Sequence, residues 1–355
     1  MITHFPSYYK NFKCIASRCK GSCCSAGWQI FIDNKTADFY KSVPGDFGKR
    51  LHSSITFCDQ PEFILTKSGR CPFLNDNNLC DIYSTLGPEH LCQICAEHPR
   101  FYECFNSFIE CGLGIYCEEA CRIILTQETP FKIYSEETND NISSDFDEEL
   151  LDYLYKCRLQ IFEYLSNTDI PINSRICDVL WFTHTIQQDI DSNMLDDEVI
   201  FSVSPTCYTD VKIFFNILLT LEPNDKNWFQ TIEQNINIYD KNIDKLKDFY
   251  KKNPQVEQYI QNLANYYVYR YFLKSIYDED ALSTLKLIAI SLNIIQTLFF
   301  CKWIETGKLD LDDCVMIAKK YAEEIECSDD NINHLRDLCY ENENFSTEKI
   351  LGLYK

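Results

Sequence analysis

The pattern of apolar and polar positions divides the chain into two parts. From residue 150 onward, apolar side chains recur every three or four residues, as at Leu151, Leu154 and Tyr155, which predicts helices. Further helices are predicted over 174–190, 208–222, 226–251, 255–277, 281–305, 309–326 and 331–342. Proline and glycine fall between several of these stretches and interrupt them. Residues 150–355 are therefore expected to form an α-helical domain.

The first 125 residues show only short helical periods, which cysteines interrupt. A helix is expected to begin near Asp33, with Asn34 or Thr36 as its N-cap. A second helix is expected over 87–95, and 107–125 reads as partly helical. This part of the chain is typical of a fold that a bound metal holds together.

The expected fold class is mainly α, with three successive regions. Residues 1–125 form an irregular, cysteine-rich metal-binding domain, 126–149 an acidic linker and 150–355 the helical domain. The most apolar stretch, 285–304, contains two lysines and several polar side chains. A membrane span needs about 20 residues with few or no charges, so a buried core helix is expected instead.

Charge is distributed unevenly between these regions. The whole chain has a formal net charge of −21. Residues 1–121 carry 11 basic and 13 acidic side chains, whereas the remainder carries 22 and 41. An acidic surface repels phosphate backbones and anionic lipid headgroups, so nucleic acid is not expected as a partner.

Cysteine is the most informative residue type. Of 20 cysteines, 13 lie between Cys14 and Cys121. The chain opens MITHFPSYYKNFK, without the apolar core of a signal peptide, so a cytoplasmic, reducing location is expected. In that setting a dense cysteine cluster indicates metal binding rather than disulfides.

The spacing of these cysteines suits a shared metal centre. Thiolates two or three residues apart can reach one centre from a turn, and a second pair from elsewhere completes the ligand set. An all-sulfur site selects zinc, copper(I) or an iron–sulfur cluster. Spacing favours an iron–sulfur cluster, with a zinc site and purely structural thiols as the alternatives.

Two segments carry a family resemblance. FKCIASRCKGSCCSAGWQIFID and CPFLNDNNLCDIYSTLGPEHLCQICAEHPR resemble the flagellin lysine-N-methylase family, which belongs to a broader group of cysteine-cluster proteins that chelate zinc or iron. The later CEEACRIIL is similar to a Cys-Pro-Glu-Ala-Ala-Arg segment of that family. Together these segments cover about residues 12–125. Beyond them the chain matches only in length and helical character.

The resemblance implies an activity and a set of ligands. The family transfers a methyl group from S-adenosylmethionine to lysine ε-amines of flagellin before export, and is associated with a [4Fe–4S] cluster. The positions that match its metal ligands are Cys14, Cys19, Cys23, Cys24, Cys71, Cys80 and Cys95. Cys92 falls where the family often has serine and ranks lower. Seven thiolates exceed the four that one cluster needs, which leaves three alternatives for the surplus: a second metal, a methyl-relay thiolate, or small buried side chains with a packing role.

Two departures weaken the third segment. Glu118 stands where the family has proline, and Cys121 where it has alanine. The C-x3-C-x2-C spacing of radical S-adenosylmethionine enzymes is also absent, because Ala26 occupies the third position.

Other side chains are candidates for the reaction itself. A lysine acceptor must lose its proton before methylation, and Asp33 and Glu119 are the candidate bases, with Glu110 also considered. Arg100 could bind the donor's carboxylate, and Trp28 is assigned with it to the cofactor site. Each of these residues also has a structural reading, as a helix cap, surface group or ion-pair partner.

Three functions remain open from the sequence. The first is a flagellin lysine N-methyltransferase with an iron–sulfur centre. The second is an iron–sulfur redox or maturation protein. The third is a zinc-stabilised module whose helical domain binds a protein partner.

Overall fold

The chain contains two compact units, each assembled from segments that are not contiguous in sequence. The computed structural model describes residues 1–138, 144–195 and 208–355. The helical unit comprises 1–11, 102–116 and 121–355, and the cysteine unit comprises 12–101 and 117–120. The predicted range 1–125 is thus shared between both units.

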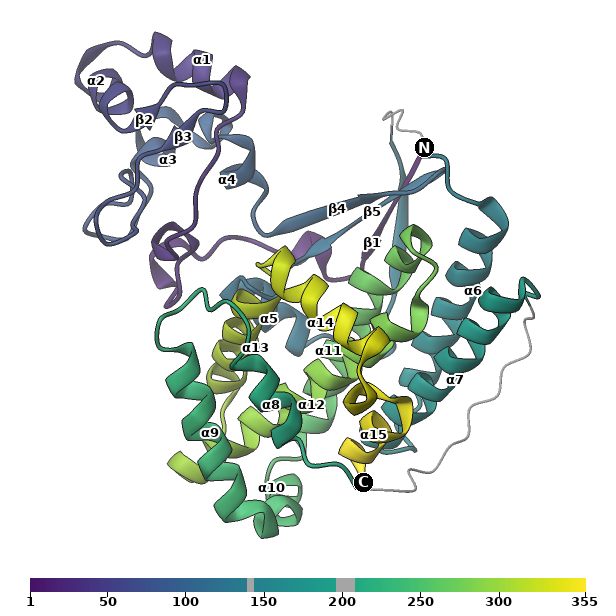
Figure 1. Cartoon of the computed structure of the whole chain (residues 1–355). Coiled ribbons are helices and arrows are strands. Elements are labelled where there is room, and N and C mark those ends of the chain that lie inside the picture. Colours follow the sequence, from purple (N-terminus) through teal and green to yellow (C-terminus); the bar gives the residue numbers. More distant parts are fainter. Residues whose placement is uncertain (139–143, 196–207) are drawn as a thin grey trace. The chain divides into compact units, whose positions relative to one another are not determined.

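The helical unit contains a four-stranded sheet. Its strands are β1 (Ile2–Pro6), β4 (Arg100–Cys104), β5 (Phe108–Leu113) and β6 (Ile133–Glu137), in the order β4-β5-β1-β6 (Figure 1). β1 pairs in parallel with β5, which places His4 opposite Glu110, and antiparallel with β6.

Residues 107–125 were expected to be partly helical, and this is confirmed by helix α5 (Glu118–Leu125) in their second half. The first half is strand β5, in which all six residues are buried. Its pairing partner β1 lies more than 100 residues earlier, so local periodicity did not indicate it. β6 falls in the predicted acidic linker, part of which, 139–143, lies outside the described residues.

The rest of the helical unit is built from helices, as the periodicity predicted. They are α6 (Glu148–Leu165), α7 (Ile172–Ser192), α8 (Lys212–Leu218), α9 (Trp228–Asn242), α10 (Leu246–Lys252), α11 (Gln255–Tyr271), α12 (Ala281–Thr306), α13 (Leu311–Ile325), α14 (Asp329–Glu341) and α15 (Thr347–Leu351). The predicted helix 226–251 is interrupted by a 3-10 turn at 243–245, and the end of 255–277 is 3-10 rather than α.

Helix α12 forms the centre of this unit. It packs against α7, α9, α11, α13 and α14. Its length and composition would allow it to cross a membrane, but 78% of its most apolar window is buried inside the protein. Asp280 caps its start by accepting a hydrogen bond from the Ser283 N–H, and Gly307 ends it with a positive φ of 72°. α12 is therefore the core helix that the sequence predicted.

The cysteine unit has a small core of its own. Its elements are α1 (Asn34–Ser42), α2 (Gly45–Ser53), α3 (Asp81–Leu86), α4 (Gln93–Glu97) and a short hairpin of β2 (Ile55–Thr56) and β3 (Glu62–Phe63). Tyr40, Leu51 and Phe73 are fully buried in the core of this unit. Cys71 and Cys92 belong to the same core.

Two local expectations in this unit were wrong. The N-cap of α1 is Asp33 itself, whose side chain accepts a hydrogen bond from the Thr36 N–H, rather than Asn34 or Thr36. The helix expected over 87–95 is broken, because Gly87 has a φ of 100° and ends α3, and a 3-10 turn precedes α4.

Candidate metal centre

Five thiols gather in the core of the cysteine unit. We call them the core thiol group: Cys24, Cys71, Cys80, Cys92 and Cys95. Cys71 and Cys92 are core residues, only 7% and 1% exposed, and the other three pack against the same core. All five are reduced thiols.

Backbone contacts bring the separate cysteine segments together. The Cys71 N–H donates to the Cys24 carbonyl at 2.8 Å, which joins the first two segments. Cys92 is the N-cap of α4, and the Cys95 N–H donates to its carbonyl at 3.0 Å. Cys92 and Cys95 therefore present their thiols from the first turn of α4.

Arg50 fixes the segment between Cys71 and Cys80. Its guanidinium donates to the Asp81 carboxylate at 2.6 Å and to the Pro72 carbonyl at 2.7 Å. A bridge between Leu74 and Cys80 closes this segment into a tight loop. The contacts of Arg50 and the bridge between Leu74 and Cys80 thus fix the backbone next to both cysteines.

Two glycines allow the first two segments to approach each other. Gly27 and Gly69 both have positive φ, 83° and 77°. A Cβ on Gly69 would lie 3.1 Å from the Cα of Gly27, tighter than ordinary packing allows. The close approach of Cys24 and Cys71 therefore depends on glycine at position 69.

The core thiols influence one another electrostatically. Burial raises the pKa of Cys71 to about 12, and negative charge at Cys24, Cys80 and Cys92 raises it further. Burial also raises the pKa of Cys80, and negative charge at Cys24 raises it further. The pKa of Cys95 is raised by its hydrogen bond with Cys92, by burial and by charge at Cys92, Cys24 and Cys71. A bound cation would stabilise the thiolate forms of these thiols.

Cys24 is the thiol that most readily ionises in this group. Its Sγ lies 4.0 Å from that of Cys23. The hydrogen bond from Cys23 lowers the pKa of Cys24 to about 7, with Ser22 and Arg70 acting in the same direction against burial. A thiolate near neutral pH is both a ready metal ligand and a nucleophile.

A second set of thiols lies around Cys23. We call Cys14, Cys19, Cys23 and Cys117 the outer thiol group. The pKa of Cys23 is raised by its hydrogen bond to Cys24, by burial and by charge at Cys24, Cys117 and Cys14. Burial raises the pKa of Cys19 to about 12, with Glu118 and Cys117 adding to it. The adjacent Cys23 and Cys24 thus connect the two groups.

Glu118 anchors the loop that carries Cys19. Its carboxylate accepts hydrogen bonds from the Lys20 N–H at 2.6 Å and the Gly21 N–H at 3.2 Å, and the Cys19 Sγ lies 3.5 Å away. The sequence analysis had selected the neighbouring Glu119 as a candidate base. Glu118 contacts the cysteine segment through these hydrogen bonds, and it is almost fully buried.

The candidate base Asp33 has a structural role here. One carboxylate oxygen accepts from the Thr36 N–H and the other from the Gln93 N–H, each at 2.9 Å. Although burial opposes the shift, these backbone donors lower the pKa of Asp33. Asp33 therefore links the start of α1 to the start of α4, next to Cys92, and is a weak base.

Trp28 and Arg100 also contact the cysteine segments. The Trp28 Nε1–H donates to the Cys23 carbonyl at 2.8 Å, and its ring meets His98 edge to face at 5.1 Å. The Arg100 guanidinium lies 5.4 Å from the centre of the Phe12 ring and donates to the Glu97 carbonyl at 3.4 Å. Both side chains thus support neighbouring segments of the cysteine unit.

Two thiols and two cations that the sequence analysis did not select lie among these groups. Cys92 is a core thiol although the family pattern placed it last, and Cys117 belongs to the outer group. Arg50 and Arg70 act through contacts between distant segments, which spacing along the chain does not indicate. A stronger signal was available for Cys92, since Cys92-x2-Cys95 has the spacing of a metal-binding pair.

The donor chemistry of the core thiol group suits a soft metal. Within the parts of the chain that the structure describes, no three His, Cys, Asp or Glu side chains are arranged to hold a single metal ion. A zinc ion needs four thiolates about 3.8 Å from one another, from tetrahedral Zn–S bonds of about 2.3 Å. An iron–sulfur cluster distributes its ligands over several irons and accepts thiolates that are further apart. The donor atoms, all thiol sulfurs, are those that such a cluster takes.

Comparison with known sequences places the chain in a family. The FliB lysine N-methylase C-terminal domain matches residues 158–353, more than half of the chain. The chain belongs to the FliB lysine N-methylase family. This match covers the helical part, in which the sequence analysis had found only length and helical character to compare.

Individual relatives of this FliB-family chain come from Salmonella. It is 27% identical over 134 residues to the lysine-N-methylases of Salmonella choleraesuis and Salmonella typhimurium, a match that covers 34% of this chain and 31% of each relative. The match to the flagellar biosynthetic protein FliU of Salmonella muenchen has the same identity and covers 75% of that protein. The chain thus spans about a third of the length of the two lysine-N-methylases that it matches. No solved structure matches it.

Proposed function

We propose that this protein is a flagellin lysine N-methyltransferase that uses S-adenosylmethionine and carries a cysteine-ligated [4Fe–4S] cluster. Membership of the FliB lysine N-methylase family is the observation that carries the activity. The names of the Salmonella relatives, lysine-N-methylase and flagellar biosynthetic protein, support the flagellin substrate. A cytoplasmic location is part of the proposal, since flagellin would be modified before its export.

The reaction is a displacement at carbon. The lysine nitrogen forms a bond to the methyl carbon while the bond from that carbon to the sulfonium sulfur breaks. The products are methyl-lysine and S-adenosylhomocysteine, and one proton leaves the nitrogen. The protein must supply a neutral amine in line with the sulfonium, and an environment that excludes competing water.

The core thiol group is the proposed ligand set of the cluster. Four of its five members are enough for one cluster, and Cys24 supplies the thiolate that ionises near neutral pH. The outer thiol group is the proposed site of a second metal. When bound, a cluster would supply a redox-active and electron-rich centre and would stabilise the fold of the cysteine unit.

Metal analysis and a methylation assay test this proposal. Protein purified without oxygen should contain about four irons and four sulfides per cluster and absorb near 400 nm. Incubated with flagellin and methyl-labelled S-adenosylmethionine, it should transfer label to flagellin lysines. Stoichiometric zinc without iron, together with no transfer, would instead support the zinc-stabilised module. Iron without transfer would support a redox or maturation protein.

A further inference from the structure

The loop between α5 and β6, residues 126–132, surrounds a cavity in the helical unit that the cysteine chemistry does not use. Its volume is about 490 Å3, within the range of about 300–1,000 Å3 that small-molecule sites occupy. Ser7 and Asn11, which follow β1, and Tyr134 of β6 also line it. We call this cavity the polar pocket, because most of its lining residues have polar or charged side chains.

Helix α11 fixes the loop that forms the polar pocket. The side-chain amide of Asn262 donates to the carbonyls of Leu125 at 2.9 Å and Gln127 at 2.8 Å. Nε2 of Gln261 donates to the Thr129 hydroxyl at 3.0 Å. Both amide side chains are almost fully buried. The pocket is therefore held in shape by the protein itself, which lowers the cost of ordering the loop when a guest binds.

Two side chains of opposite charge line the polar pocket. Glu128 and Lys132 form no ion pair and no side-chain hydrogen bond with any residue that the structure describes. Arg122, in the last turn of the preceding helix α5, lies by contrast 2.6 Å from the Asp312 carboxylate. A guest that carries both an ammonium and a carboxylate would give Glu128 and Lys132 each a partner of opposite charge.

An α-amino acid head group has this pair of charges on a single carbon atom. Lys132 can donate to its carboxylate, and Glu128 can accept from its ammonium. The Thr129 hydroxyl accepts from Gln261 and keeps its own proton to donate. The side-chain amide of Asn11 adds a donor and an acceptor to the same wall. The polar pocket thus offers groups that match every polar atom of such a head group.

An aromatic side chain provides a surface for the rest of the guest. Tyr134 is 51% exposed, and its ring contacts that of Phe5 edge to face at 6.3 Å. An exposed aromatic ring is a stacking surface for a planar base, whatever the identity of that base. A guest with an amino acid head group at one end and a nucleobase at the other therefore suits the lining of the pocket.

We propose that the polar pocket binds S-adenosylmethionine through its amino acid end, with the carboxylate on Lys132 and the ammonium on Glu128. The adenine ring packs on Tyr134. The identity of the methyl donor rests on the proposed function, whereas recognition of an amino acid head group rests on the pocket alone. The sulfonium gives this donor a net positive charge, which favours its approach to the acidic part of the chain.

Two compounds test the role of the amino acid end. S-Adenosylhomocysteine and methylthioadenosine share the nucleoside and a thioether, but only S-adenosylhomocysteine has the amino acid head group. Isothermal titration of the full-length protein should show about tenfold tighter binding of S-adenosylhomocysteine, as expected for hydrogen bonds to charged groups. Equal affinity for the two compounds, or no binding of S-adenosylhomocysteine, would overturn the proposal.

Variants that remove one charge locate the head group. Lys132→Met and Glu128→Gln should each weaken the binding of S-adenosylhomocysteine by about tenfold. Neither should change the affinity for methylthioadenosine, because that compound has no group for either charge to bind. Unchanged binding of S-adenosylhomocysteine in both variants, or equal losses for the two compounds, would overturn the proposal. Thermal unfolding verifies that both variants fold.

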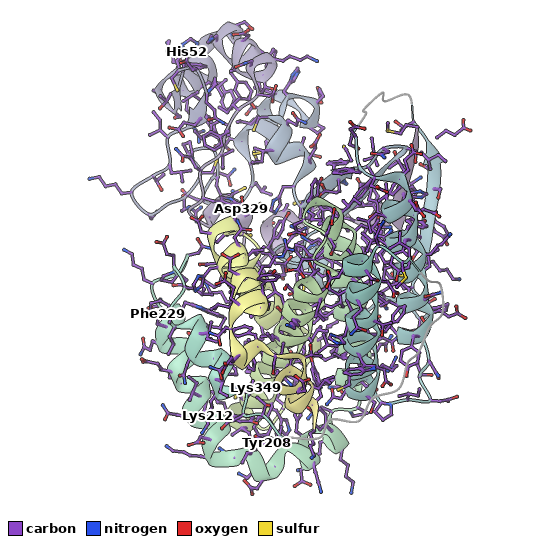
Figure 2. All side chains as sticks on the ribbon, turned by 45° about the vertical axis from the view of Figure 1, so that its right-hand side comes forward. His52, Tyr208, Lys212, Phe229, Asp329 and Lys349 are labelled. Carbon is purple, nitrogen blue, oxygen red and sulfur yellow. The ribbon has the colours of Figure 1, made fainter. Side chains whose placement is uncertain are left out.

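Lys349→Met is the matched control. Lys349 belongs to α15 of the same unit and is labelled in Figure 2. Its Nζ donates to Oδ1 of Asn344 at 2.9 Å, and it does not line the polar pocket. This variant should bind both compounds like the unmodified protein. A loss equal to that of Lys132→Met would overturn the proposal, because the effect would then be one of overall charge.

Methyl transfer measurements separate this proposal from the proposed function. Binding of S-adenosylhomocysteine that depends on Lys132, without any methyl transfer to flagellin, would support the pocket and contradict the proposed function. Methyl transfer with an unchanged KM for S-adenosylmethionine in Lys132→Met would overturn the pocket and leave the function standing. Loss of S-adenosylhomocysteine binding in Arg100→Gln but not in Lys132→Met would place the donor's carboxylate in the cysteine unit, and would also overturn the pocket.

Discussion

Arg158 and Glu110 form a bidentate ion pair in the interior of the helical unit. Nη1 of Arg158 donates to one carboxylate oxygen at 2.8 Å, and Nη2 pairs with the other. The arginine side chain is fully buried and the carboxylate is 3% exposed. The pair joins α6 to β5, and it occupies the carboxylate that the sequence offered as a possible base.

Glu110→Gln tests how strongly this pair supports the fold. The substitution leaves Arg158 buried without its counter-charge, which costs about 3–5 kcal/mol in free energy of unfolding. Denaturant unfolding followed by circular dichroism measures it. Glu136→Gln is the matched control, since it breaks the exposed pair with Lys10 and should change stability by no more than about 1 kcal/mol. If both substitutions lowered the free energy of unfolding by no more than about 1 kcal/mol, the buried pair would contribute no more to stability than an exposed one.

Cys24→Ala should abolish metal binding, because Cys24 interacts with Cys71, Cys80 and Cys95 and ionises most easily. Iron, sulfide and zinc are measured on protein purified without oxygen. Cys58→Ala is the control, since Cys58 is exposed and donates to the Gln60 carbonyl. Full metal content in Cys24→Ala would remove Cys24 from the ligand set.

Gly69→Ala should destabilise the cysteine unit more than Gly27→Ala does. Both residues have positive φ, which costs an alanine about 1–2 kcal/mol. Gly69 alone adds the close contact with the Gly27 Cα, whereas a Cβ on Gly27 meets nothing within 4 Å. Thermal unfolding and metal content of both variants provide the comparison. Equal losses of thermal stability in the two variants would mean that the positive φ alone, and not the contact between the two segments, requires glycine at position 69.

The Asp225 carboxylate should stabilise the fold at neutral pH and lose this effect in acid. Its hydrogen bond with Lys320, at 2.8 Å, and the Asn227 N–H lower the pKa of Asp225 from its usual 3.8. A lowered folded-state pKa gives stability that is present above 3.8 and lost as pH falls through the lower value. The difference in melting temperature between the unmodified protein and Asp225→Asn should therefore begin to shrink below about pH 5 and continue to shrink as the pH falls through the lowered pKa. A constant difference would exclude this carboxylate as its source.

Helices with a continuous apolar period could be predicted closely. α12 was expected over 281–305 and spans Ala281–Thr306, and α13 was expected over 309–326 and spans Leu311–Ile325. Local signals mark three of these four ends: Asp280 and Asp310 cap the starts, and Gly307 ends α12. Periodicity and capping are local properties, so the sequence was enough.

Contacts between distant segments could not be predicted in this way. The pairing of His4 with Glu110 in the sheet joins positions more than 100 residues apart. The spacing of the cysteines indicated a metal centre, but not that Cys24 belongs with Cys71 and Cys80, while Cys23 belongs with Cys14 and Cys117.

The position of β1 in the sheet has a consequence for the synthesis of the protein. β1 leaves the ribosome well before its two neighbours, β5 and β6, which are translated only after residues 107 and 132. Until then both edges of β1 are unpaired, and the cysteine-rich segment follows directly after it. Unpaired strand edges promote aggregation, and pairing over such distances is slow. The nascent chain is therefore expected to need protection, as by a chaperone, until β1 has a partner.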